Sequence, residues 1–295
     1  MMPNVVKGKK AFPFSEGIMA KSISQAGIPV SDAYAVVRQV RKELNQEGKN
    51  TIDSDVLREL VSEKMLTEGW EAEERMYRVQ RHIKYLAAPV FILIGGTTGV
   101  GKSTVAAEIG HRLGINRVIG TDTIREIMRS IISENLIPTL HSSTFEAAKV
   151  FHSFAGEGQL IPGFKEQVRV LNEGVAAVIE RGTKEGLHMV LNGVHIVPGY
   201  LEETLDRVPD HLFRFVLSVP EETQHEMFFY EREQASRRPA QRYAKNLDKI
   251  RKMQDYILRM AEHYNVTVIE NREYEETLKR IQQEVISGFS EEIDR

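Results

Sequence analysis

The chain has 295 residues, a formal net charge of -3 and no cysteine. Its length suffices for one large or two modest domains. The lack of cysteine excludes disulfides, thiolate catalysis and Cys-ligated zinc, and so balanced a charge favours neither nucleic acid nor an anionic membrane as the main partner. No long uncharged apolar segment is present, and Lys7, Lys9 and Lys10 interrupt any apolar region of a signal peptide. We therefore expect a soluble, cytoplasmic protein.

The first eighty-six residues differ in pattern from the rest of the chain. Residues 5–14 predict a short hairpin, and Ser15 can cap a helix that runs to about Gln25. Further helices are expected over residues 31–47, 53–64 and 71–85. This segment can be a helical extension that packs on the core. Its Val-Val-Lys-Gly opening, Pro-Phe-Ser turn and following helices also resemble an ATP-cone, which implies an adenine-nucleotide-sensing domain over residues 1–86 and a kinase domain over 87–295.

From Ala88 onward, strand patterns alternate with helical ones. This order predicts an α/β fold of the P-loop NTPase type, in which helices flank a parallel sheet. Strands are expected over residues 90–94, 117–120, 188–191, 212–219 and 266–270, and helices over 104–113, 123–133, 166–181, 221–233 and 244–263. Because ligands of such sheets bind at the carboxyl ends of the strands, functional residues are expected just after each strand.

The first of these strands is followed by a phosphate loop. Eight consecutive residues match the pattern G-x-x-x-x-G-K-(S/T), namely Gly96, Thr97, Thr98, Gly99, Val100, Gly101, Lys102 and Ser103. Thr104 follows directly and is also expected to contact the nucleotide. The glycines allow backbone N–H groups to surround a phosphate, and the helix N-terminus adds partial positive charge. Lys102 would then reach the β- and γ-phosphates of ATP, and the Ser103 hydroxyl would ligate Mg²⁺. The strand–loop–helix context argues against a chance glycine loop.

Asp122, Arg125 and Arg129 follow the second predicted strand. The arginines are four residues apart and share a helix face, where they can clamp an anionic acceptor. Asp122 stands at the helix start, where it can cap the helix and also act as a base or hold Mg²⁺ through water. A plain helix cap with a solvated arginine face is the alternative. After the third strand come Asn192, where many phosphate-loop enzymes carry an acid, and His195, which can contact substrate or be structural.

Two further stretches are candidates for contact with the substrates. His141, Ser142 and Ser143 form a polar loop that suits an anionic acceptor or an ordinary turn. Arg237 and Arg238 fall where many small-molecule kinases place a lid whose arginines meet the transferring phosphoryl group. A solvated charge run is the alternative for these arginines.

In combination these motifs resemble the archaeal 2-phosphoglycerate kinases, over essentially the whole chain. The matching stretches are residues 95–104, 120–126, 140–143, 193–199 and 237–238, with the helix that follows. The resemblance implies transfer of the γ-phosphoryl group of ATP, with Mg²⁺, to the free hydroxyl of 2-phosphoglycerate, giving 2,3-bisphosphoglycerate. The alternatives are a related kinase for another phosphorylated alcohol, such as mevalonate 3-phosphate or an inositol phosphate, and a non-catalytic ATP-sensing regulator. Asn192 departs from the acid expected at its position.

Overall fold

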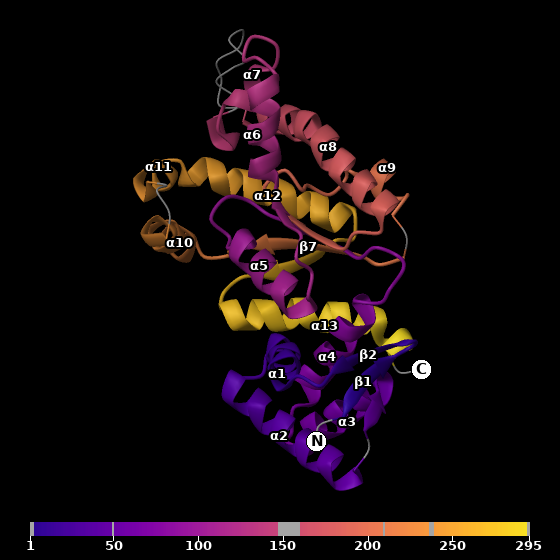
Figure 1. The fold of residues 1–295 in the computed structure, drawn as a ribbon. Coiled ribbons are helices and arrows are strands. Elements are labelled where there is room, and N and C mark those ends of the chain that lie inside the picture. The colour runs from indigo at the N-terminus through magenta and orange to yellow at the C-terminus, as the bar shows by residue number, and fades with distance from the viewer. Residues whose placement is uncertain (1–2, 49, 147–159, 209, 236–238, 294–295) are drawn as a thin grey trace. The chain divides into compact units, whose positions relative to one another are not determined.

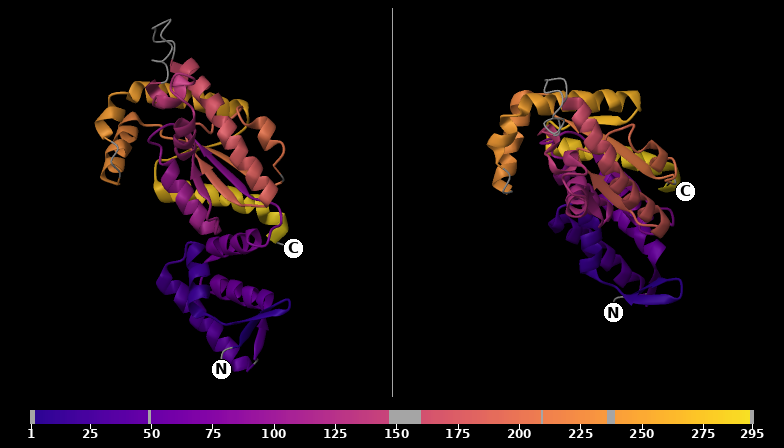
Figure 2. Two further views of the ribbon diagram at one scale, coloured as in Figure 1. Left: turned by 45° about the horizontal axis from the view of Figure 1, so that its top comes forward. Right: turned by 90° about the horizontal axis from the view of Figure 1, so that it is seen from above.

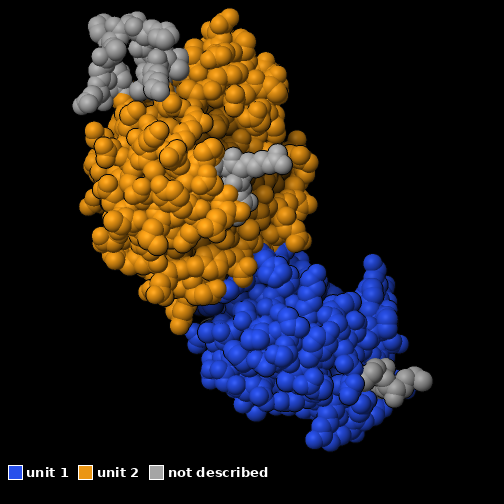
Figure 3. Space-filling view, turned by 90° about the vertical axis from the view of Figure 1, so that its left-hand side faces the viewer, with its two compact units in different colours: residues 1–86, 111–114, 286–295 blue, residues 87–110, 115–285 orange. Residues whose placement is uncertain are grey.

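The computed structural model describes residues 3–48, 50–146, 160–208, 210–235 and 239–293. The chain divides into two compact units, which Figure 3 shows in different colours. Unit 1 comprises residues 1–86, 111–114 and 286–295, and unit 2 comprises residues 87–110 and 115–285. The last residues of helices α5 (Lys102–Leu113) and α13 (Tyr274–Ile293) are thus counted with unit 1.

Unit 1 combines a small mixed sheet with amphipathic helices (Figure 1). Strand β1 (Asn4–Lys7) pairs antiparallel with β2 (Lys10–Pro13) and parallel with β3 (Thr51–Asp53). The helices are α1 (Glu16–Gln25), α2 (Val30–Glu47), α3 (Ser54–Thr67) and α4 (Glu71–Ile83). The predicted hairpin and helices are confirmed, and Ser15 caps α1 by accepting a hydrogen bond from the Ile18 N–H at 3.4 Å. Strand β3 was missed, because a three-residue strand is too short to show a periodic pattern.

Unit 2 is built on a parallel sheet with the strand order β5-β6-β4-β7-β8. In that order the strands span Val118–Gly120, Met189–Asn192, Phe91–Gly95, Leu212–Ser218 and Thr267–Glu270. The predicted α/β fold is confirmed, and each strand begins and ends close to its expected bounds. β4 is buried along its whole length, as expected for a central strand covered on both faces.

Helices cover both faces of this sheet (Figures 1 and 2). On one face lie α8 (Leu160–Glu185) and α12 (Leu247–His263), and on the other lie α5 and α13. Apolar side chains of α8 and α12, among them Val168 and Ile250, pack with Val216 of β7 in one core cluster. Each such buried side chain stabilises the fold by about 1.5–3 kcal/mol relative to exposure. This packing on both faces of the sheet stabilises the positions of the strand ends at its carboxyl edge.

Some helix bounds differ from the prediction. α6 (Thr121–Ile131) begins two residues early, and α8 begins six residues early because its Pro162 falls in the first turn, where a missing N–H costs little. The helix expected over residues 244–263 is α12 (Leu247–His263), which begins three residues late, and the short α11 (Ala240–Ala244) before it was not expected. The remaining helices are α7 (Pro138–His141), α9 (Glu202–Leu205) and α10 (Glu222–Ala235). None of the described helices is long and apolar enough to cross a membrane.

Candidate active site

The phosphate loop follows β4 directly and leads into α5. Gly99 and Gly101 have φ angles of 88° and 82°, a conformation that residues with a side chain rarely adopt. A Cβ on Gly99 would lie 2.2 Å from the Phe229 ring, and one on Gly101 would lie 2.6 Å from the Asn271 amide nitrogen. These positions therefore require glycine for space as well as for backbone conformation.

Carbonyl groups of the loop are held by donors from distant parts of the chain. His225 of α10 donates through Nε2 to the Thr98 carbonyl at 2.8 Å, and Asn271, just after β8, donates through Nδ2 to the Val100 carbonyl at 3.1 Å. A planar trans peptide directs its C=O and the following N–H to opposite sides. The N–H groups of residues 99 and 101 consequently point away from these donors, as a phosphate cradle requires.

Neither donor could be identified from the sequence. His225 is fully buried and lies against Phe229, with ring centroids 5.3 Å apart. Burial lowers the pKa of His225 to about 4, so the ring is neutral at pH 7 and donates through Nε2 alone. Asn271 is held in turn by the Thr277 hydroxyl, which donates to its Oδ1 at 2.9 Å. Both side chains lie more than a hundred residues after the phosphate loop in the sequence, so no local motif could identify them.

Ser103 and Asn192 lie together at the carboxyl ends of the strands. The Ser103 hydroxyl donates to Asn192 Oδ1 at 3.0 Å, while Asn192 Nδ2 faces the Ile119 carbonyl at 3.5 Å. The amide is therefore oriented with its oxygen towards the phosphate loop. Hydroxyl and amide oxygens suit Mg²⁺, which in phosphate sites takes few ligands from the protein and the rest from phosphate and water. The residues fit the ion, although no cluster of three or more His, Asp or Glu in the described parts of the chain forms a cage for a metal.

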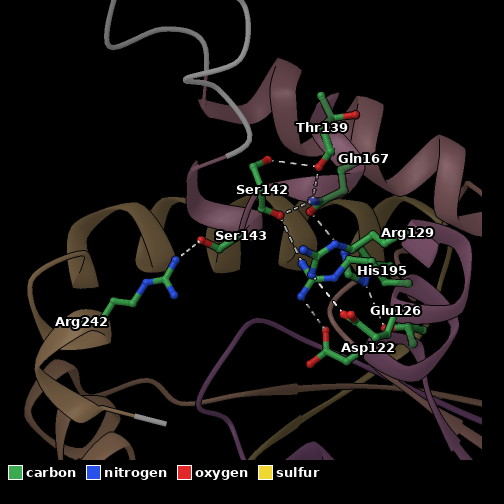
Figure 4. Close-up of polar contacts among 11 residues, drawn as sticks. Asp122, Glu126, Arg129, Thr139, Ser142, Ser143, Gln167, His195 and Arg242 are labelled. Carbon is green, nitrogen blue, oxygen red and sulfur yellow. Dashed lines mark hydrogen bonds and ion pairs between the residues drawn. The ribbon is translucent and has the colours of Figure 1, made fainter. Parts of the chain in front are cut away.

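Asp122, labelled in Figure 4, and Arg125 lie on the first turns of α6, at the carboxyl end of β5. The Asp122 carboxylate is 49% exposed and 3.6 Å from Arg125 Nη2. Arg129, one turn further, pairs with Glu126 at 3.0 Å. The expectation that Asp122 caps the helix is wrong: α6 begins at Thr121, so the cap position belongs to the preceding glycine and Asp122 falls within the first turn. Its carboxylate still favours the positive end of the helix dipole.

The predicted polar loop is in part the short helix α7, which ends at His141, and the residues after it lie beside Arg125. Arg125 Nη1 donates to the Ser142 carbonyl at 3.3 Å, and the Ser142 hydroxyl donates to the Thr139 carbonyl at 3.1 Å. Gln167 of α8, which the sequence did not single out, donates from Nε2 to the carbonyls of Thr139 and Ser142 at 2.6 and 3.0 Å. The loop thus contacts the arginine through its backbone, whereas the prediction had concerned its hydroxyl groups.

The two predicted histidines both bind groups of the protein. His195 is fully buried, accepts at Nδ1 from the Thr121 hydroxyl at 3.0 Å, and donates at Nε2 to Gln167 Oε1 at 3.2 Å. Burial lowers the pKa of His195 to about 3, which keeps the ring neutral. His141 donates through Nε2 to the Ile132 carbonyl at 2.8 Å. Neither ring nitrogen of His195 has a lone pair or proton left for a substrate.

The predicted lid lies between α10 and α11. Arg237 and Arg238 lie outside the described residues, and their role remains a prediction. Arg242 of α11 is described: its Nη2 is 2.7 Å from the Ser143 hydroxyl and 2.6 Å from the Glu146 carboxylate. The helix that follows the lid segment is therefore joined to the loop next to Arg125 (Figure 4).

Comparison with known proteins identifies close relatives. No established family profile matches the chain. The 2-phosphoglycerate kinase of Pyrococcus horikoshii is 40% identical over 287 residues, covering 97% of this chain and 94% of that protein. The enzyme of the same name from Thermococcus kodakarensis is 40% identical, covering 96% of each chain, and that from Methanopyrus kandleri is 38% identical, covering 91% and 82%. Among solved structures, the shikimate kinase of Acinetobacter baumannii in complex with shikimate is 14% identical, with a TM-score of 0.41 over 72% of this chain and 98% of that one.

Proposed function

The chain belongs to the family of archaeal 2-phosphoglycerate kinases, and from this membership we propose that it transfers the γ-phosphoryl group of ATP to the free hydroxyl of 2-phosphoglycerate, giving 2,3-bisphosphoglycerate. One observation carries the proposal within the structure itself. The carboxylate and guanidinium of Asp122 and Arg125 lie at the same edge of the sheet as the phosphate loop. A γ-phosphoryl donor and an anionic acceptor can therefore bind beside one another.

The phosphate loop and Lys102 bind the nucleotide. In the structure Lys102 is buried and its Nζ donates to the Thr97 carbonyl at 2.6 Å. We infer that Lys102 leaves this carbonyl for the β- and γ-phosphates when ATP enters, because a phosphate oxygen makes the stronger, charge-assisted hydrogen bond. Ser103, oriented by Asn192, would be the protein ligand of the metal. Bound Mg²⁺ neutralises charge that develops on the phosphate oxygens.

Asp122 and Arg125 act on the acceptor. Asp122 accepts the proton of the attacking hydroxyl while the new O–P bond forms and the bond between the γ-phosphorus and the bridging oxygen of ADP breaks. Arg125 binds an anionic group of the acceptor, and Arg129 adds positive charge one turn away. Ser142 and Ser143 border the same space.

An acceptor panel tests the reaction. ADP release should depend on added acceptor and should be greatest with 2-phosphoglycerate rather than with mevalonate 3-phosphate or an inositol phosphate. Arg125→Glu should raise the acceptor KM by at least about tenfold while the ATP KM changes little, because a charge-assisted hydrogen bond to the acceptor is lost. ATP binding without ADP release, whichever acceptor is added, would favour the non-catalytic regulator.

We also propose that residues 1–86 form an ATP-cone-like domain that binds an adenine nucleotide. A cluster of positive charge supports this proposal: Lys7 Nζ lies 2.8 Å from the Tyr85 ring centroid, and Arg81 and Lys84 lie within 6 Å of it. Such a cluster next to an aromatic ring suits a nucleotide's phosphates and base. Equilibrium dialysis with a non-hydrolysable ATP analogue should find two sites in the full chain. Lys7→Glu should remove one of them and spare the site that Lys102→Ala weakens.

A further inference from the structure

A chain of hydrogen bonds runs through the interior of unit 2 to the loop beside Arg125. It starts at the Thr121 hydroxyl, passes through the His195 ring, and reaches the Gln167 side chain. From Gln167 it ends on the Ser142 carbonyl, the atom to which Arg125 also donates. Figure 4 shows His195 and Gln167 of this chain of hydrogen bonds beside Ser142.

The direction of every hydrogen bond in this chain is fixed. Gln167 uses its NH₂ group for two carbonyls, so its Oε1 must face His195 and accept. His195 must then carry its proton on Nε2, which leaves Nδ1 to accept from Thr121. Both His195 and Gln167 are fully buried, so water cannot replace either partner. This series of hydrogen bonds therefore has only one arrangement, and that arrangement fixes the position of the Ser142 carbonyl in the loop.

We propose that Gln167 and His195 are positioning residues for the acceptor: they hold the Ser142 carbonyl where it orients the Arg125 guanidinium towards the acceptor's anionic group. The proposal rests on the proposed function, in which Arg125 binds the acceptor. Arg125 has two described partners on its guanidinium, the Asp122 carboxylate at 3.6 Å and the Ser142 carbonyl at 3.3 Å. If the loop moves, only the bond to Asp122 orients the arginine, and the acceptor site loses its shape while the phosphate loop keeps its own donors.

The experiment compares Gln167→Leu with Asn172→Leu. Both residues lie on α8 and are buried, but neither polar atom of the Asn172 side chain has a hydrogen-bond partner among the described residues. Gln167→Leu should raise the KM for 2-phosphoglycerate by about tenfold and leave the ATP KM within about twofold, since only hydrogen bonds near the acceptor are lost. Asn172→Leu should change neither KM. Equal shifts of both KM values in Gln167→Leu, or no shift, would overturn the proposal.

Hydrogen exchange of the loop separates this proposal from the proposed function. Peptides that cover residues 138–146 should exchange about tenfold faster in Gln167→Leu than in the wild type and unchanged in Asn172→Leu, because local opening is easier without the two bonds from Gln167. If the wild type fails to phosphorylate 2-phosphoglycerate, the proposed function is wrong. Independently of that result, unchanged hydrogen exchange of residues 138–146 in Gln167→Leu would refute the claim that Gln167 holds the loop in place. Faster exchange with an unchanged acceptor KM would refute the role in catalysis.

Two further changes keep the test open if Gln167→Leu does not fold. Gln167→Glu keeps the shape and still accepts from His195, but its carboxylate cannot donate to the loop carbonyls; it should behave like the leucine variant. His195→Gln places an amide near the position of the Nε2 atom, keeps the contact with Gln167, and should therefore retain most of the affinity for the acceptor. His195→Asn places its amide nearer to Nδ1, loses the contact with Gln167, and should raise the acceptor KM. Equal behaviour of the two His195 variants would contradict the proposed chain.

Discussion

Replacing Asp122 and Asn192 in turn tests where the catalytic centre lies. The carboxylate of Asp122 is half exposed and has Arg125 at 3.6 Å. Asp122→Asn keeps the shape of this side chain but removes its charge and its ability to accept a proton. Asn192 is buried, and its described contacts are the neutral hydrogen bond from Ser103 at 3.0 Å and the longer one to the Ile119 carbonyl. The two changes therefore remove very different interactions.

The expected sizes of the effects follow from these contacts. A well-placed general base contributes typically about 10²–10⁴ in rate, so Asp122→Asn should lower kcat by about a hundredfold or more. One neutral hydrogen bond contributes about 0.5–1.5 kcal/mol net, so Asn192→Ala, which removes mainly the bond from Ser103, should cost on the order of tenfold. Neither change touches the glycine loop or Lys102, and ATP binding should largely persist.

Steady-state kinetics at saturating ATP and Mg²⁺ would measure both values of kcat, and calorimetric titration of a non-hydrolysable ATP analogue would measure nucleotide binding. Asp122→Glu serves as the matched control, because it retains a carboxylate and should keep more activity than Asp122→Asn. The reasoning is refuted if Asn192→Ala proves the more damaging change while Asp122→Asn stays active. That ranking would place the base or the metal's main ligand on β6 and not on α6.

Three other changes follow from the site. Lys102→Ala should abolish detectable transfer, because the β- and γ-phosphates lose their cation, while thermal unfolding of the chain without ligand stays close to that of the wild type. Gly99→Ala should lower the free energy of unfolding by about 2–4 kcal/mol in urea titrations, from a φ of 88° and a Cβ placed 2.2 Å from Phe229; Gly17→Ala, whose Cβ would have no neighbour nearer than 3.9 Å, should not destabilise the chain. Because burial lowers the pKa of His225 to about 4, the unfolded state binds the extra proton first, and the free energy of unfolding should fall by up to about 1.4 kcal/mol per pH unit as the pH drops from about 6.5 towards 4. Urea titrations across this range should show a shallower fall for His225→Gln, and an equal fall in both proteins would contradict this assignment.

The sequence was most informative where function depends on a local pattern. The phosphate loop, the strands and the place of Asp122 and Arg125 all follow from motifs a few residues long. The domain boundary after residue 86 and the roles of the site residues stay predictions. His225, Asn271 and Gln167 were missed because each acts through a contact between segments far apart in the chain, which no periodicity records. Asp122 was placed at the helix cap because its residue type favours that position, although the helix already starts at Thr121.

The strand order has a consequence for how such an enzyme can change its substrate. β6 lies between β4, which leads to the phosphate loop, and β5, which leads to α6. Asn192, the last residue of β6, binds Ser103 on the nucleotide side. His195, three residues later, binds Thr121 on the acceptor side. A Cβ on Gly193, between them, would lie 1.8 Å from the Thr121 hydroxyl. A substitution that shifts the backbone of this segment, such as one at Gly193, would disturb both substrate sites at once. A new acceptor specificity therefore has more room to evolve in the loop around Ser142 and Ser143 than at the end of β6.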